Sequence, residues 1–327
     1  MPQSTQLGVK KETTWGTAVV VDRFYEYESE SITPTVERVE GTFMRAGTRG
    51  MREDRFIPYV SSYTGAVKMP VLTKTFGLWL EHMLGTVASG SVSDSTYTHT
   101  GTIATLCGKG LTVQVNRPLG ACGDTDQAFT FEGGKVADFT LSCEQGGYAT
   151  FEANMVFEAG TTATALATAS YVTGMELMPF GLSSLTVGGS QLDVKSWSVK
   201  CNNGLATDRK MVRSSYQIKE PIENARREVE FTATCDFEAL ADVYNRAVSS
   251  TASGALAAVV ITTLGPTLVG ATTYPGLVIT MDKVRFDSGF PTVGSPDITE
   301  IQLTGKALVP VSGNQLSVAF RSSESTP

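Results

Sequence analysis

Apolar residues recur at helical spacing between residues 73 and 85. They fall at positions i, i+3, i+4 and i+7 and are Phe76, Trp79, Leu80 and Met83. This spacing places them on one stripe of a helix, with His82 outside the stripe and facing solvent. Thr75 is expected to be the N-cap and Gly85 to end the helix, because these residue types are favoured at those positions.

A second stretch, residues 234–245, has the same stripe. Its apolar positions are Phe237, Leu240, Ala241 and Tyr244, and Asp236 stands where an N-cap is expected. The pattern predicts that both helices pack their apolar stripes against a core.

Most of the remaining chain alternates apolar and polar residues, which predicts β-strands with one buried face. The clearest runs are 66–71, 111–115, 139–143 and 149–157, followed by 197–201, 229–233, 257–261, 277–281 and 301–307. Glu144 to Gly147 reads EQGG and predicts a turn that joins two of these strands as a hairpin. Ser, Gly and Thr dominate residues 88–98, which are expected to form a loop.

The order of these elements agrees between the two halves of the chain. We therefore predict a mainly β protein of two tandem units, residues 1–160 and 175–310, each a β-sandwich or barrel with one flanking helix. The Ala/Thr-rich residues 161–174 are expected to be a linker, and the Ser-rich residues 311–327 a flexible tail.

Residues 40–57 of the first unit form an Arg-rich stretch with neither helical nor strand periodicity at its centre. The residues singled out as candidates are Arg45, Arg49, Arg52, Arg55 and Phe56. Long irregular loops in compact domains are usually functional or disordered. The stretch is either a solvated loop or an arm that packs on a neighbouring subunit, where Arg is a favoured residue type.

A polar stretch occupies the corresponding place in the second unit, between residues 202 and 224. It is shorter, and its candidate residues are Arg209, Lys210 and Arg213.

Charge and composition narrow the classes of function. The 327 residues carry a net charge of −7, which argues against a specific nucleic-acid binder, since such proteins usually have a basic face. No apolar run is long enough to span a bilayer, and residues 1–16 do not resemble a secretory signal. The five cysteines form no CxxC pair and are expected to be reduced thiols.

Residues suited to catalysis are scarce. The two histidines, His82 and His99, have no ligand or triad partners at useful spacing, and the phosphate-loop, GxSxG and HExxH motifs are missing. We therefore expect neither an enzyme nor a metal or cofactor site.

Several segments together resemble the tail tube proteins of long-tailed bacteriophages. They are GVKKETTWGTA at 8–18, ESES at 28–31, RAGTR at 45–49, FGLWLEHMLG at 76–85, YTHT at 97–100, GLTVQVNRP at 110–118, KVADFTLSC at 135–143 and NNGLATDR at 202–209. The resemblance covers nearly the whole chain and is specific as a series, although each motif alone is weak.

The resemblance implies a structural protein of the virion tail that assembles with itself in the host cytoplasm. Such proteins close into rings, and the rings stack into a tube through which genomic DNA passes without specific binding. Tail terminator, tape measure and baseplate or tip proteins are the other implied partners, and no membrane is. In this family the long loop reaches a neighbouring subunit or ring, a role that falls here on residues 40–57 and, more weakly, on 205–225.

Two units per chain favour a ring of three chains with pseudo-sixfold symmetry over a ring of six chains. Another virion or secretion-tube component of the same fold, and a β-rich enzyme or carbohydrate-binding module, are the alternatives.

Overall fold

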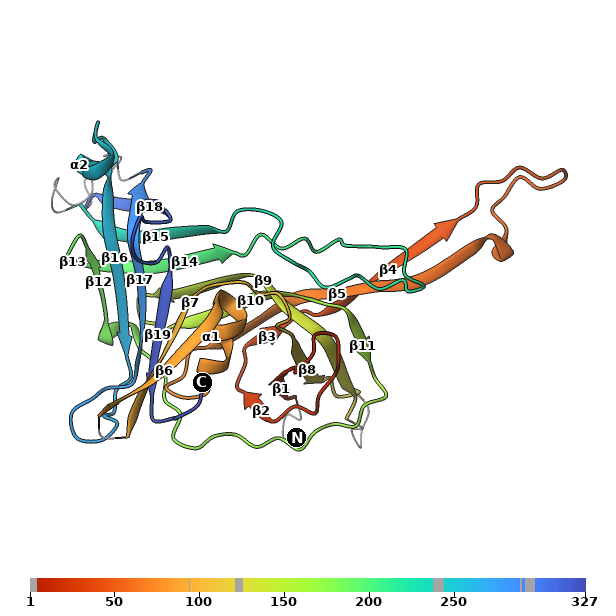
Figure 1. The fold of residues 1–327 in the computed structure, drawn as a ribbon, viewed down its shortest axis with the longest axis horizontal. Helices are drawn as coiled ribbons and strands as arrows, with labels where there is room; N and C mark the ends of the chain where they lie inside the picture. Colours follow the sequence, from red (N-terminus) through yellow and green to blue (C-terminus); the bar gives the residue numbers. More distant parts are fainter. Residues whose placement is uncertain (1–4, 94, 121–125, 238–243, 289, 292–297) are drawn as a thin grey trace.

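The computed structural model describes residues 5–93, 95–120, 126–237, 244–288, 290–291 and 298–327, and they form a mainly β protein (Figure 1). Within these ranges, none of the helices has the length and apolar character needed to cross a membrane.

A small sheet is built from strands of the first half of the chain. Its strands, in spatial order, are β2 (Arg23–Tyr25), β1 (Leu7–Lys11), β8 (Leu111–Asn116), the first part of β9 (Ala128–Glu144) and β11 (Ala159–Thr161). All pairs are antiparallel, and the apolar side chains of β1 and β8 belong to the common core. The prediction that residues 111–115 have one buried face is wrong, because Thr112, Gln114 and Asn116 on the other face of β8 are buried as well.

A larger antiparallel sheet continues from the second part of β9 in both directions. One side carries β10 (Thr150–Phe157), β5 (Phe56–Pro70), β3 (Ser29–Glu30) and β4 (Thr33–Glu40). The other side carries β14 (Val194–Asn202), β15 (Glu228–Asp236), β18 (Glu300–Ala307) and β17 (Gly276–Phe286). The predicted EQGG turn between β9 and β10 is confirmed, since the Gly147 N–H donates to the Glu144 carbonyl at 3.0 Å.

Strand β17 leads into the remaining strands. It pairs with β16 (Leu256–Leu264), which continues to β12 (Ser183–Val187) and β13 (Ser190–Leu192). It also pairs with β19 (Ser317–Ser322), followed by β7 (Thr96–Ile103) and β6 (Gly85–Ser93). The helical segments are η1 (Glu53–Arg55), α1 (Gly77–Leu84), η2 (Phe180–Leu182), α2 (Tyr244–Ala247) and α3 (Ala252–Ala255).

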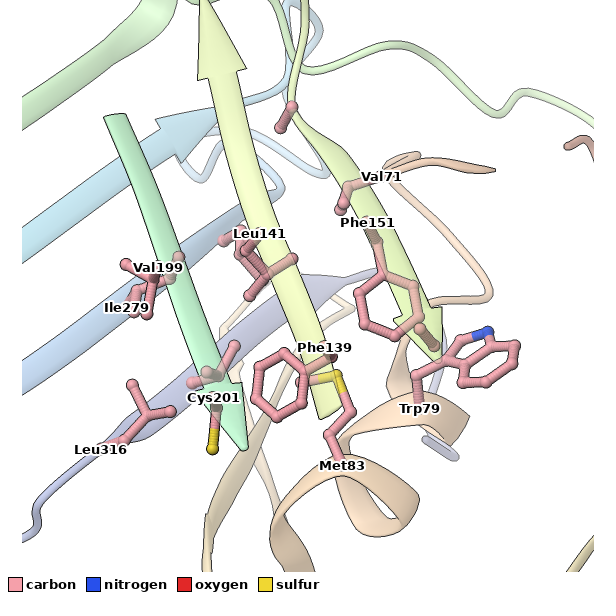
Figure 2. Packing of buried hydrophobic residues seen from close by; sticks show 14 of the residues in the cluster. Val71, Trp79, Met83, Phe139, Leu141, Phe151, Val199, Cys201, Ile279 and Leu316 are labelled. Carbon is pink, nitrogen blue, oxygen red and sulfur yellow. The ribbon is translucent and has the colours of Figure 1, made fainter. Parts of the chain in front are cut away.

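Helix α1 lies against the core, with its apolar stripe turned toward β9 and β10 (Figure 2). Phe76, Trp79, Leu80 and Met83 are all buried. The Phe151 ring lies 5.2 Å from both the Phe76 and the Trp79 rings. Aromatic pairs at such distances add to the free energy gained from burial alone.

The ends of α1 were only partly predicted. Gly85 ends the helix with a left-handed φ of 111°, as expected for a glycine C-cap. The N-cap prediction is wrong: Phe76 occupies that position, and Thr75 has a φ of 73° and donates its N–H to the Glu324 carboxylate. His82 was expected to face solvent but is 3 % exposed, because α1 is covered by the β6–β7 hairpin as well as by the sheet.

The second predicted helix is wrong at its beginning, although Tyr244 at its end does begin helix α2. Residues 234–236 belong to strand β15, and Asp236 pairs with Lys195 instead of capping a helix. Phe237 is partly buried against the core. Leu240 and Ala241 lie outside the described residues, and Tyr244 is exposed.

The predicted tail is also wrong, because residues 317–322 form strand β19 between β17 and β7. Leu316, Val318 and Phe320 are fully buried there. The loop prediction for residues 88–98 fails in the same region, since most of them belong to the β6–β7 hairpin.

The two predicted units share strands in one sheet. Strand β9 pairs with β14 over residues 138–144 and 196–202, and one continuous core contains residues of both units. The expected linker packs along the small sheet, where Gln114 bonds the backbone of Ala165 and Ala167. The tandem arrangement is not confirmed by this topology and stays a prediction.

Candidate assembly interface

A two-stranded ribbon projects from the body (Figure 1). We call residues 36–60 the arm: they comprise most of β4, the outer part of β5 and the loop between them. The pairs Val36–Val60, Glu37–Tyr59 and Val39–Ile57 define its register. The centre of the predicted irregular stretch is confirmed, because residues 41–52 belong to no helix or named strand. Residues 53–55 form η1, and the flanking strands β4 and β5 make the whole segment a hairpin.

A β-bulge marks the point where the arm leaves the body. Thr35 pairs with Ser62 and Val36 with Val60, so Ser61 is the extra residue. Its hydroxyl donates to a Glu37 carboxylate oxygen at 3.0 Å. Bulges bend and twist a ribbon, and this one lies at the root of the arm.

The arm exposes large apolar side chains. Phe43 is 81 % exposed and Met44 fully exposed, and the strand residues Val39 and Ile57 are 58 % and 54 % exposed. Phe56, one of the candidate residues, is 42 % exposed. Exposed apolar groups gathered on one projecting element are typical of an interaction site.

The arginines of the arm fall into two groups. Arg52 holds Asp54 with two hydrogen bonds of 2.8 and 2.7 Å, and Arg55 reaches the same carboxylate at 2.9 Å. The hydrogen bonds from Arg52 lower the pKa of Asp54 to about 2. Arg45 and Arg49 flank a turn at Gly47, whose φ is 80°, and form no ion pair with any described residue. The tip therefore presents two cations that have no carboxylate partner among the residues that the structure describes.

The second polar stretch lies against the base of the arm (Figure 1). We call residues 205–223 the brace. The Tyr216 ring stacks on the Tyr59 ring at 4.5 Å, the Ile218 N–H donates to the Ser61 carbonyl at 3.0 Å, and Lys210 pairs with Glu37. These contacts hold the arm at its root.

The other candidate residues of the brace also bond within the chain. Arg213 pairs with Glu158 at 2.8 Å, and Arg209 donates to the Glu220 carbonyl. Glu220 in turn accepts a 2.6 Å bond from Lys135, whose side chain is buried. The brace is therefore a support for the arm, and its predicted role as a separate contact with a neighbour stays a prediction.

Sequence reasoning missed several residues that shape this interface. Tyr59 and Tyr216 are far apart in sequence, and no period links them. Val36, Val39, Ile57 and Val60 were not recognised as strand residues because their apolar positions do not alternate simply. The signal that could have found them is the pair of β-branched and aromatic runs flanking a Gly-containing segment.

The family comparison agrees with the resemblance noted in the sequence. The family model described as "Phage tail tube protein" matches residues 2–315. No curated protein is similar enough in sequence to be compared with the chain. Because the match spans nearly the whole chain, the protein belongs to the phage tail tube protein family.

Proposed function

We propose that this chain polymerises as stacked rings into the tail tube of a long-tailed phage, and that the tube conducts DNA during ejection. Family membership supports a structural role in the tail. The observation that carries the proposal is the arm, which projects from the body and exposes apolar side chains that its own chain leaves uncovered. A neighbouring subunit is the partner that covers them.

The ring contains three chains in this proposal. Each chain contributes two β-rich halves, so three chains give six similar positions around the axis. A ring of six chains, with one half of each on the outer surface, is the alternative.

A net charge of −7 is suited to a protein that lines a tube through which DNA passes. An acidic tube wall repels phosphates, whereas Lys- and Arg-rich walls would hold DNA by displacing its counterions. Tail terminator, tape measure and baseplate or tip proteins would complete the tail at its two ends and along its axis.

Cryo-electron microscopy of the purified protein, classified for symmetry along the filament axis, tests this proposal. We expect rings of three chains around a lumen of approximate sixfold symmetry. Six chains per ring would retain the tube and overturn the trimer. If the protein stays monomeric over a wide range of protein and salt concentrations, self-polymerisation is overturned.

A further inference from the structure

The brace connects β14 to β15 and leaves the body as a loop with two legs (Figure 1). Close to the body, the Ala206 N–H donates to the Ile222 carbonyl at 2.9 Å. Further out, the Lys219 N–H donates to the Arg209 carbonyl at 2.8 Å. These bonds join the two legs into one unit, with its base on the body and its tip on the arm.

The brace gains little from apolar burial. Among its residues, all of which the structure describes, only Ile218 and Pro221 are buried. Met211 and Val212 at the tip are exposed. Segments with few buried apolar contacts open locally at a small cost in free energy. The position of the brace therefore depends on its polar contacts.

Two carboxylates at the base of the brace hold the turn between β7 and β8. Glu223 accepts the Leu106 N–H at 2.5 Å. Glu220 accepts the Gly108 N–H, also at 2.5 Å. Glu220 pairs in addition with Lys135, whose ammonium donates to the Leu106 carbonyl at 2.7 Å. Hydrogen bonds to a charged group are about twice as strong as neutral ones, so these contacts fix the base of the brace firmly.

The residues on either side of the brace bind the end of helix α1. The side-chain amide of Asn203, which is buried, donates to the Met83 carbonyl at 3.1 Å. The Arg227 guanidinium donates to the Leu84 carbonyl at 3.2 Å. The last carbonyls of a helix have no partner within the helix, and these bonds satisfy two of them. The base of the brace is thus fixed both on α1 and on the turn.

The tip of the brace meets the arm at its β-bulge, through the contacts with Glu37, Tyr59 and Ser61. A two-stranded ribbon that leaves its sheet is marginally stable, and a bulge is a place where a ribbon bends. The brace gives the arm a second attachment beside its own two strands. The far end of that attachment is the pair of carboxylates on the turn.

We propose that Glu220 and Glu223 are positioning residues that set the direction in which the arm projects. They act through the brace, from the end that lies away from the arm. This inference rests on the proposed self-assembly and adds how the free chain is prepared for it. An arm held in one direction loses less conformational freedom when it docks, and preorganisation of this kind strengthens binding.

Pulsed electron paramagnetic resonance of the unassembled full-length chain tests the inference. Spin labels are attached through p-acetylphenylalanine at Thr42 on the arm and at Lys200 on the body, both of which are exposed. We expect a narrow distribution of distances between the labels in the otherwise native chain. In E220A/E223A the distribution should be at least about twofold broader, because the base of the brace is released.

Two matched variants separate positioning from loss of charge. E220Q/E223Q keeps an oxygen that accepts each backbone N–H, so it should restore most of the native width. E28A/E230A also removes two carboxylates, which pair with Lys68 and Lys306 on the body, and should keep the native width.

Amide hydrogen exchange at Gly108 reports whether the base of the brace has been released. Fast exchange there, together with a native distance distribution, would overturn the inference. E220A also leaves the buried Lys135 without its carboxylate, so urea unfolding checks that the double variant folds. If it does not fold, E223A and the tip variant K210A/Y216A take its place, and native widths in both would overturn the inference.

Polymerisation gives a second measurement. E220A/E223A should raise the critical concentration by about tenfold, yet the tubes that form should have native symmetry, because the arm itself is unchanged. An unchanged critical concentration would contradict preorganisation by the brace. Absence of tubes in the native chain would count against the proposed function, whereas the distance measurement on unassembled protein would still decide the inference.

Discussion

The β9–β10 hairpin and the arm are both antiparallel ribbons, but their side chains are distributed differently. In β9–β10, the Phe151–Leu141 and Ala153–Phe139 pairs share one buried face, and Glu152–Thr140 lies on the other (Figure 2). In the arm, apolar pairs occupy both faces and none is buried. The first hairpin buries its apolar pairs within the chain, whereas the second leaves its apolar pairs exposed.

The comparison shows how an assembly element can be recognised without a bound partner. A strand pair with one apolar face is satisfied by one layer of its own domain. A strand pair with two apolar faces and no covering layer requires partners, because exposed apolar area of this kind favours association. Removing apolar groups should therefore cost stability in β9–β10 and assembly in the arm.

The largest effect on stability is expected from Phe151→Ala. This side chain is fully buried and touches the rings of Phe76, Trp79 and Phe139, so its removal leaves a cavity in the core. We expect a loss of about 3–5 kcal/mol in the free energy of unfolding. Urea unfolding of unassembled protein measures it, with Val39→Ala as the arm control, expected to cost less than about 0.5 kcal/mol. Similar losses for both variants would remove the distinction between the two hairpins.

Acid should weaken the body more than the arm. Burial lowers the pKa of His82 from 6.5 to about 3, so the folded protein keeps this imidazole neutral. Below pH 6.5 the unfolded chain takes up a proton that the folded chain does not, and stability falls until the pH nears 3. At pH 5 the loss from this group is about 2 kcal/mol. At that pH the Asp54 ion pairs of the arm persist, because its pKa is about 2.

Comparing the pH dependence of unfolding in the native chain and in His82→Leu isolates this contribution, since other groups titrate in both. The variant should lose less stability between pH 7 and pH 5. Equal slopes for the two proteins would mean that His82 takes up its proton in the folded state.

The smallest effect on stability, and a large one on assembly, is expected from joint replacement of Arg45, Arg49 and Arg52 with Glu. Exposed substitutions of this kind change the free energy of unfolding by about 0.5 kcal/mol or less each. Tube growth, followed by light scattering and negative-stain microscopy, should stop. Replacement of Lys200, Arg226 and Lys283 with Glu changes the net charge equally, at exposed sites on the body. If this control also stops growth, overall charge is responsible instead of the arm.

Features that depend on a single buried face could be read from the sequence. The alternating strands β14, β15 and β18 were found with nearly correct bounds, and so was the apolar stripe of α1. In each, a regular period reports one contact surface. The family resemblance rested on short segments along the whole chain, and the family match confirms it.

Features that depend on distant or external partners could not be read in the same way. The β6–β7 hairpin is built from small polar residues and is held by pairing with β19, which a local pattern does not reveal. His82 is buried by an element that covers the polar side of α1. The arm was not predicted to be a hairpin, because apolar residues on both of its faces interrupt the alternation of apolar and polar positions that is expected for a strand. The alternation of Leu316, Val318 and Phe320 was, by contrast, a visible signal of β19.

The place of β19 in the sheet also means that β7 is synthesised long before one of its two partner strands. Strand β19 lies against β7, where Ala319 pairs with Thr100, so the two partners are separated by roughly 220 residues. A ribosome that adds about 5–20 residues per second needs about 10–40 s to synthesise the intervening chain. During that time the outer edge of β7 stands open on the nascent protein, and an open strand edge is a place where chains pair wrongly. The edge of β7 is closed only when residues 317–322 have been made and pair with it as β19.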